Sequence, residues 1–360
     1  MIDQDILRAH TLPAAFYRDR HPFTNFKESL FRDAWHYLHA DTQAWNSHNA
    51  FPVTILPGYL DEPVLLTKDR KHEVRCMSNV CTHRGNLLLQ TPAQLPLLRC
   101  RYHGRCFGLD GVCRSQTGFE DVLDFPGPKD HLTSIDLKTI GVLHFGRIRK
   151  NVAFDSVFQP MLDRLSWFPF RDLIFDNTRS HDYSVKAHWA LYVDNYLEGY
   201  HVPFIHPALS AALDTKKYEY QLYPGSTLQL GRASEKEQTV FNFPSSAVDA
   251  SERIYAYYWW IFPNLMFNVY PWGLSLNSVE PISLTETRVR FFTFVLKDEM
   301  PPDFSAIHQV EMEDEAIVEQ VQHGISSSFY KEGRYSPAHE TAVHHFHLQL
   351  SHYLDAMNDK

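Results

Sequence analysis

The sequence is poor in glycine and has no long apolar run. Its 360 residues include 15 glycines, which form no Gly-rich dinucleotide fingerprint, and no flavin motif is present. If the chain catalyses a redox reaction, its electrons would therefore come from a separate protein. The most apolar stretch, 255–270, holds Pro263 and two asparagines and is typical of strands, so no transmembrane span is predicted.

Cysteine is also scarce. The five cysteines are an odd number, and the N-terminal residues lack the basic start and apolar run of a secretory signal peptide. We therefore expect a cytoplasmic protein whose cysteines are thiols, some of them metal ligands, and no disulfide framework.

Positive charge is in deficit, and repeats and low-complexity tracts are absent. The net charge of -9 argues against nucleic acid and anionic membranes as main partners. The 25 Phe, 18 Tyr and 7 Trp residues indicate well-packed cores, and the length suffices for two domains. The 21 histidines raise the expectation of metal chemistry without locating it.

The residue pattern changes twice along the chain. Short β-rich runs separated by turn residues dominate one region, and a mixed pattern follows, with strands at 254–279 and 287–296 and helices at 303–323 and 337–355. The predicted class is α+β. The predicted parts are an N-terminal helical arm (1–38) that docks on a core, a β domain (39–150) and an α+β domain (151–360).

Two Cys/His pairs lie within the predicted β domain. Cys81 and His83 form the first pair, sixteen residues follow, and Cys100 and His103 form the second. Such a set could hold a tetrahedral zinc ion or a Rieske [2Fe–2S] cluster, in which one iron has two Cys ligands and the other has two His ligands. Zinc fingers usually pair Cys with Cys and His with His, so one Cys and one His in each arm favour the cluster. Cys76, Cys106 and Cys113 fall outside the pattern and are expected to be plain thiols.

A second polar constellation follows further along the chain. Read as one helix, residues 191–201 place Asn195, Glu198 and His201 on one face of an otherwise apolar segment. Taken alone, this stripe is equally compatible with a buried polar network and with half of an iron site formed by His201 and His206. Pro203 would kink the helix and turn His206 back towards the metal.

A third ligand is expected from the helix 303–323. Two His and one carboxylate form the usual facial ligand set of non-haem Fe(II) oxygenases. Asp314 lies in the middle of the apolar stripe of this helix, whereas Glu313 and Glu315 point to either side. The alternative is that residues 311–315 form a solvated acidic run.

Taken together, Cys81-x-His83, Cys100-x-x-His103 and the downstream string Asn195-x-x-Glu198-x-Tyr200-His201-x-x-x-x-His206 resemble the oxygenase (α) component of Rieske non-haem iron oxygenases. The resemblance covers nearly the whole chain. It implies an all-β Rieske domain followed by a helix-grip catalytic domain, in which an antiparallel sheet is covered by helices. It also implies a [2Fe–2S] cluster, a mononuclear Fe(II) site, O₂ as co-substrate, and a reductase that donates electrons directly or through a ferredoxin.

The resemblance further implies roles for single residues. His201, His206 and Asp314 would bind the mononuclear iron, and Asn195 would lie near its open positions. Glu198 would bridge the iron site to a cluster histidine of a neighbouring subunit, which implies a head-to-tail homotrimer. Most members have aspartate at the position of Glu198, and a branch acting on quaternary ammonium compounds has glutamate. His188 stands where many members have asparagine and carries no functional expectation.

The aromatic stretch 255–272 supplies sheet core and some pocket wall. An aromatic pocket suits a quaternary ammonium head through cation–π contact or a flat ring through stacking. The string Trp260-Ile261-Phe262-Pro263-Asn264 looks most like the choline and glycine-betaine monooxygenase branch, so hydroxylation or N-demethylation of a small amine is expected. Aromatic-ring dioxygenation is the alternative enzyme function. A Rieske electron carrier or a zinc-stabilised binding module is the non-enzyme alternative, and neither has a use for His201, His206 and Asp314.

Overall fold

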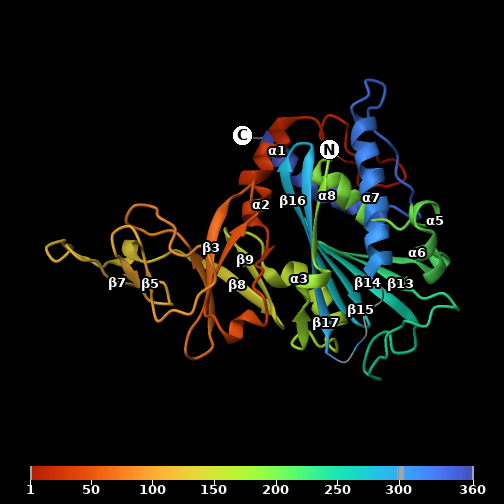
Figure 1. Ribbon diagram of the computed structural model, residues 1–360. Helices are drawn as coiled ribbons and strands as arrows, with labels where there is room; N and C mark the ends of the chain where they lie inside the picture. The colour runs from red at the N-terminus through yellow and green to blue at the C-terminus, as the bar shows by residue number, and fades with distance from the viewer. Residues whose placement is uncertain (1, 298, 300–303, 359–360) are drawn as a thin grey trace. The chain divides into compact units, whose positions relative to one another are not determined.

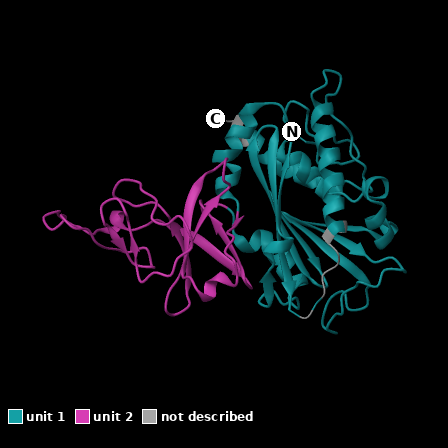
Figure 2. Cartoon of the chain, viewed as in Figure 1, with its two compact units in different colours: residues 1–34, 152–360 teal, residues 35–151 magenta. Residues whose placement is uncertain are grey.

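The computed structural model describes residues 2–297, 299 and 304–358 and divides into two compact units (Figures 1 and 2). One unit comprises residues 35–151, and the other comprises residues 1–34 and 152–360. The first unit is built on β-sheets and the second on a sheet with helices, so the predicted α+β class is confirmed. Among the described residues, no helix is long and apolar enough to cross a membrane.

The unit 35–151 contains a six-stranded and a three-stranded antiparallel sheet. The larger has the order β1-β9-β8-β4-β3-β2 and the smaller the order β5-β6-β7. The strands are β1 (His36–Tyr37), β2 (Ala50–Ile55), β3 (Glu62–Lys68), β4 (Val74–Ser78), β5 (Leu98–Arg99), β6 (Cys106–Phe107), β7 (Cys113–Ser115), β8 (Ser134–Ile140) and β9 (Leu143–Arg147).

A continuous apolar core lies beneath the two Cys/His loops of this unit. Leu65 and Met77 from the larger sheet pack with Leu98 and Phe107 from the smaller one, and all four are almost fully buried. Because the loops project from strands fixed by this core, their cysteine side chains have a rigid support.

The second unit is organised around one large antiparallel sheet with the order β10-β17-β16-β15-β14-β13-β12, in which β11 also pairs with β17. Its strands are β10 (Leu173–Phe175), β11 (His181–Val185), β12 (Glu219–Tyr223), β13 (Ser226–Arg232), β14 (Ile254–Ile261), β15 (Leu265–Tyr270), β16 (Gly273–Ser283) and β17 (Glu286–Leu296). The helices of the chain are α1 (Arg20–Glu28), α2 (Leu30–Asp33), α3 (Phe154–Arg164), α4 (Trp189–Tyr196), α5 (Val202–Ile205), α6 (Pro207–Ala212), α7 (Phe304–Ile325) and α8 (Thr341–Asn358).

Helices cover both faces of this sheet (Figure 1). Phe158 of α3 contacts Phe267, whereas Tyr196 of α4 bonds to the adjacent Asn268. Neighbouring strand residues point to opposite faces, so α3 and α4 lie on opposite sides of the sheet. Helix α7 packs against α4, and together with the sheet these two helices enclose the region where the predicted iron ligands converge.

The N-terminal residues belong to this second unit up to residue 34. Phe31 packs edge-on against Trp189 at 5.2 Å between ring centroids, and both side chains are fully buried. The predicted helix 303–323 corresponds to α7, with its predicted first residue outside the described residues, and the predicted helix 337–355 corresponds to α8.

The prediction of one helix through residues 191–201 is wrong. Helix α4 ends at Tyr196, and a separate short helix, α5, begins at Val202. Pro203 lies in the first turn of α5, where a missing backbone N–H has no cost, so it does not kink a longer helix.

Candidate metal centres

The break between α4 and α5 is held by the side chain of Glu198. Its Oε2 accepts hydrogen bonds from the backbone N–H groups of Tyr200 and His201, the latter at 3.0 Å. Gly199 lies against the ring of Tyr218, where an added Cβ would come within 3.0 Å of the nearest ring atom. The segment is therefore stabilised as a tight turn, and His201 faces inward from its end.

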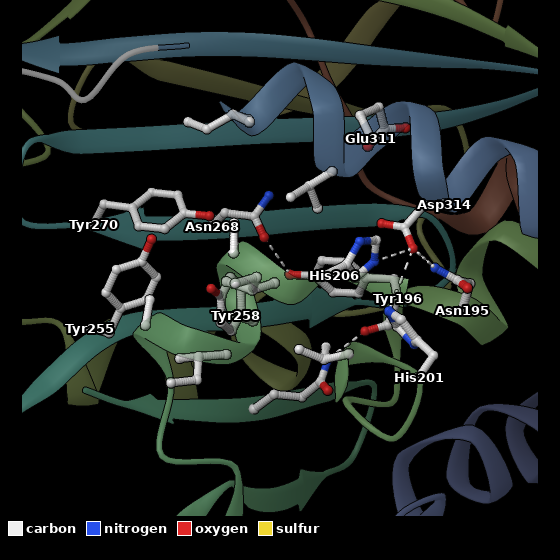
Figure 3. A pocket seen from close by; sticks show the side chains of 18 of the residues that line it. Asn195, Tyr196, His201, His206, Tyr255, Tyr258, Asn268, Tyr270, Glu311 and Asp314 are labelled. Atoms are coloured by element: carbon white, nitrogen blue, oxygen red, sulfur yellow. Dashed lines mark hydrogen bonds and ion pairs between the residues drawn. The ribbon is translucent and has the colours of Figure 1, made fainter. Parts of the chain in front are cut away.

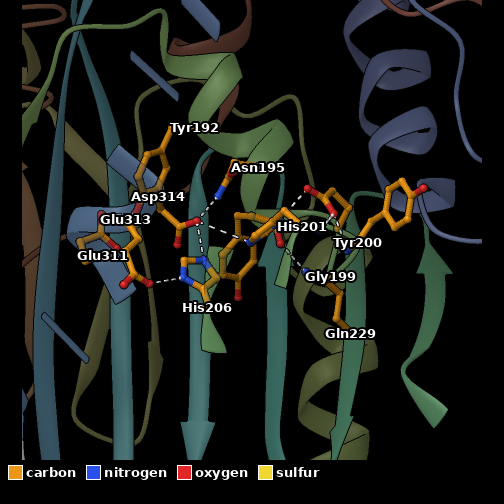
Figure 4. Close-up of polar contacts among 12 residues, drawn as sticks. Tyr192, Asn195, Gly199, Tyr200, His201, His206, Gln229, Glu311, Glu313 and Asp314 are labelled. Atoms are coloured by element: carbon orange, nitrogen blue, oxygen red, sulfur yellow. Dashed lines mark hydrogen bonds and ion pairs between the residues drawn. The ribbon is translucent and has the colours of Figure 1, made fainter. Parts of the chain in front are cut away.

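Three of the predicted ligands converge at this turn. One side-chain atom each from His201, His206 and Asp314 lies within 4.8 Å of the other two. Oδ1 of Asp314 lies 2.9 Å from Nε2 of His206 and 3.5 Å from Nε2 of His201 (Figure 4). Two imidazole nitrogens and one carboxylate oxygen facing a common point form a set that suits non-haem iron.

The outer nitrogen of each histidine contacts a further carboxylate. Nδ1 of His201 lies 2.6 Å from Oε1 of Glu198, and Nδ1 of His206 lies 2.8 Å from Oε2 of Glu313. Such contacts orient a ligating imidazole and leave Nε2 directed at the metal. Burial lowers the pKa of His206, but its bonds to Asp314 and Glu313 outweigh that effect, and the net pKa is raised.

The contact of Glu313 with His206 is not predicted by the sequence pattern. Helical periodicity directs the Glu313 side chain away from the stripe that holds Asp314, and only the position of His206 after the turn brings the two together. Of the other acids on α7, Glu311 is 6% exposed and Glu315 is 9% exposed, so the alternative of a solvated acidic run is excluded.

Asn195 also contacts this site. Its Nδ2 donates a hydrogen bond of 2.7 Å to Oδ1 of Asp314, from the last turn of α4. The side chain therefore helps to fix the orientation of the carboxylate that both histidines face.

A cavity of about 350 Å³ opens beside the three converging residues. In Figure 3, His206, Asp314 and His201 lie on one side of Asn268, and Tyr255 and Tyr270 lie on the other. Its lining is largely aromatic and apolar, which suits a small organic molecule. The aromatic lining residues are Tyr192, Tyr196, Tyr218, Tyr255, Tyr258, Tyr270, Trp272 and Phe291.

In the unit 35–151, the two Cys/His loops have the same hydrogen-bond pattern. The carbonyl of Cys81 accepts from the N–H of Gly85, and that of Cys100 accepts from the N–H of Gly104, both at 3.0 Å. Gly85 and Gly104 have φ values of +71° and +76°, a backbone conformation that favours glycine. Two matched turns thus present one Cys and one His each.

The exposure of these four residues is graded. Cys81 and Cys100 are buried, at 1% and 2% exposed, whereas His83 is partly exposed and His103 is exposed. The two histidine rings lie 4.8 Å apart between centroids. A binuclear cluster with cysteines on the inner iron and histidines on the outer iron fits this arrangement.

Buried Arg105 joins the first loop to its surroundings. Its guanidinium donates to Gln116 at 2.6 Å, to Thr82 at 2.9 Å and to Asp130 at 3.0 Å, and Gln116 in turn contacts Nδ1 of His83. The three cysteines outside the pattern are buried free thiols: Cys76, Cys106 and Cys113.

Comparison with known families agrees with both constellations. Residues 174–356 match the family described as "Ring hydroxylating alpha subunit (catalytic domain)", and residues 48–126 match "Rieske [2Fe-2S] domain". The first match includes His201, His206 and Asp314, and the second includes both Cys/His loops.

Curated relatives match along nearly the whole chain. Chloroplastic choline monooxygenase of Arabidopsis thaliana is 27% identical over 371 residues, covering 96% of this chain and 83% of the relative. The carnitine monooxygenase oxygenase subunit of Escherichia coli (strain K12) is 27% identical over 365 residues, covering 95% of this chain and 93% of the relative.

Solved structures share the fold at lower identity. The quaternary ammonium Rieske monooxygenase CntA with γ-butyrobetaine superimposes with a TM-score of 0.75 at 21% identity, covering 97% of this chain and 95% of that one. Naphthalene 1,2-dioxygenase from Rhodococcus sp. gives a TM-score of 0.72 at 16% identity, covering 96% and 94%. Since the catalytic-domain match spans just over half of the 360 residues and the Rieske match contains the cluster loops, the chain belongs to the ring-hydroxylating alpha subunit family and is the oxygenase of a Rieske-type system.

Proposed function

We propose that this oxygenase hydroxylates or N-demethylates a quaternary ammonium compound or a related small amine. The observation that carries the proposal is the aromatic cavity that opens directly beside His201, His206 and Asp314. Tyrosine and tryptophan faces attract ammonium groups through cation–π contact. The relatives named for choline and carnitine support the same class.

The proposed site residues divide into two sets. Cys81, His83, Cys100 and His103 would hold a [2Fe–2S] cluster. His201, His206 and Asp314 would hold a ferrous ion. When bound, the cluster supplies electrons one at a time and the ferrous ion supplies the position at which O₂ is activated.

The chain's own residues place the substrate and orient the ligands. Glu198 and Glu313 hold the outer nitrogens of the two histidines, and Asn195 holds the carboxylate of Asp314. The largely apolar cavity wall would hold the reacting part of the substrate beside these ligands. In the overall reaction, one substrate C–H bond becomes C–OH, the other oxygen atom leaves as water, and two electrons and two protons are consumed.

We propose a separate NAD(P)H-dependent reductase as electron donor, with or without a ferredoxin between the two proteins. The Glu198–His201 contact supports an electron route to a neighbouring subunit, and we propose a head-to-tail homotrimer on that basis. None of the five cysteines forms a disulfide in the described structure, which supports a cytoplasmic location.

The test is O₂ consumption with a surrogate reductase, measured together with product. Choline and related amines should stimulate both, and His206→Ala should abolish product while leaving the visible and EPR spectra of the cluster intact. Stimulation by arenes alone would replace this proposal with ring dioxygenation, and loss of the cluster spectrum in His206→Ala would refute the ligand assignment.

A further inference from the structure

Acidic side chains line the cavity without any lysine or arginine among the described residues. The titratable acids and histidines of its wall are Glu198, His201, His206, Glu237, Glu311 and Asp314. The contacts of Glu198, His201, His206 and Asp314 belong to the iron site, so Glu237 and Glu311 are the carboxylates left for a ligand.

Glu311 is the more deeply placed of the two. It is 6% exposed and lies three residues before Asp314 on α7, on the same side of the cavity (Figure 3). Its Oε1 accepts a hydrogen bond of 2.6 Å from the hydroxyl of Tyr192. Its Oε2 makes no hydrogen bond or ion pair with a described residue. Burial, together with the nearby charge of Asp314, raises the pKa of the Glu311 carboxyl well above its usual range, so its charged form is costly unless a cation arrives.

Aromatic rings stand around the same space. Tyr255 and Tyr258 both pack edge-on against Tyr270, each at 6.1 Å between ring centroids. Glu237 lines the cavity too, and burial together with the charge of Glu237 raises the pKa of Tyr255. Aromatic rings and carboxylates therefore line the same cavity, a combination that suits a positive group.

Among the described residues, the smaller cavity next to this one contains a single guanidinium and no lysine. It measures about 50 Å³, shares Asn268, Tyr270 and Glu311 with the main cavity, and includes Arg179 in its wall. That guanidinium is paired with Asp176 at 2.6 Å. A carboxylate on a substrate would therefore compete with an existing ion pair.

We propose that Glu311 is the counter-ion of a substrate cation, and that this cavity selects ammonium compounds without a carboxylate over zwitterions such as glycine betaine or carnitine. The inference rests on the proposed function and narrows its substrate class. A ferrous ion with Asp314 as its one carboxylate ligand would keep a net positive charge and would repel a substrate cation. The carboxylate of Glu311 would offset that repulsion.

The test is calorimetric binding to the Fe(II)-loaded, anaerobic protein with three probes that differ in charge. Choline is cationic, 3,3-dimethylbutan-1-ol is its neutral carbon isostere, and glycine betaine is a zwitterion. Choline should bind at least roughly tenfold more tightly than either of the others. Glu311→Gln should weaken choline binding by roughly tenfold or more and leave the isostere unchanged within about twofold.

Two further variants keep this result interpretable. Glu311→Asp retains the charge and should retain the preference for choline. Glu235→Gln removes the same charge from an exposed position outside the cavity and should change nothing. Iron content and cluster absorbance establish that each variant is folded and loaded.

The outcomes separate the two proposals. Glycine betaine binding as tightly as choline, or choline binding unaffected by Glu311→Gln, would overturn the role of Glu311 while the amine oxygenase survives. If none of the three probes binds, or an arene alone is oxidised, the proposed function falls and this inference falls with it.

Discussion

At the scale of single residues, the proposed iron site depends on which nitrogen or metal position each carboxylate faces. Oδ1 of Asp314 faces Nε2 of both histidines and accepts a hydrogen bond from Asn195. Glu198 and Glu313 take the outer nitrogens. One carboxylate thus faces the proposed metal position, and two others orient the histidine rings. Substituting a ligand should therefore have a different effect from substituting a residue that orients a ligand.

Asp314→Asn and Glu313→Gln each replace a carboxylate by an amide of the same shape, at adjacent positions. Asp314→Asn should abolish O₂-coupled turnover and leave iron only in the cluster, because an amide is a poor third ligand. Glu313→Gln should keep the site and lower iron affinity or activity by about 10- to 100-fold. Metal analysis and product assays check both, and equal losses in the two variants would contradict the assignment of ligand and support.

His188 gives a prediction about pH. It is 1% exposed, and its Nδ1 accepts a hydrogen bond from the N–H of Ala190 at the start of α4. Burial lowers its pKa from 6.5 to about 3. Because the folded pKa lies below the unfolded one, the stabilisation is fully present above pH 6.5 and is lost progressively as pH falls towards 3. About 2 kcal/mol should be lost at pH 5.

His188→Asn keeps a side-chain cap and cannot be protonated. Its free energy of unfolding, measured in urea at pH 8 and pH 5, should therefore fall less than that of the wild type. Parallel loss in the two proteins would show that His188 is not the group that titrates.

At the scale of elements, the segment 197–206 shows which features the sequence pattern predicts and which it does not. The motif spacing identifies His201 and His206, and apolar periodicity places Asp314 in the buried stripe of α7. Periodicity also predicts a continuous helix, which is wrong, because Glu198 caps the backbone of the following turn. A side chain that competes with helical hydrogen bonding in this way has no signature in an apolar pattern.

The sequence predicts the strands of the sheets better than it predicts the contacts between side chains. Within the predicted β domain, β8 and β9 form a hairpin that pairs with β4 and β1 and completes the larger sheet. Contacts such as Glu313 with His206 join elements about a hundred residues apart, and no local pattern encodes them.

The matched loops of the cluster unit give a prediction at this scale. Gly104→Ala should destabilise the second loop by about 1–2 kcal/mol, because a φ of +76° is unfavourable for a residue with a Cβ. The variant should unfold at a lower temperature and retain less cluster, measured by absorbance during heating.

Gly324→Ala is the matched control. Gly324 lies in α7 with no positive φ, and an added Cβ would meet no described atom within 4 Å other than its chain neighbours and the backbone of its own helix. The Gly324→Ala protein should keep its cluster and be as stable as the wild type or slightly more stable. Retention of cluster and stability in Gly104→Ala would contradict the role of the loop turn.

At the scale of the whole molecule, the two proposed metal centres belong to different compact units, and electrons must pass between centres. In the proposed trimer they pass between subunits, with Glu198 as the bridge. A co-expressed mixture of Cys81→Ser and His206→Ala chains tests this route, because each variant alone lacks one centre.

The mixture should regain about a quarter of wild-type turnover, since a quarter of the head-to-tail neighbours in randomly mixed rings pair an intact cluster with an intact iron site. Each variant alone should be inactive. A mixture that stays inactive, despite forming mixed oligomers by native mass spectrometry, would mean that electrons do not cross between subunits.

We expect one chain to carry a Rieske cluster and a separate mononuclear iron. Iron and sulfide analysis with EPR on the Fe(II)-loaded wild type and on His206→Ala tests this expectation. The wild type should contain about three irons and two sulfides per chain with a Rieske signal, and His206→Ala should contain about two irons with the same signal. Zinc in place of iron and sulfide, or only two irons in the loaded wild type, would contradict the account.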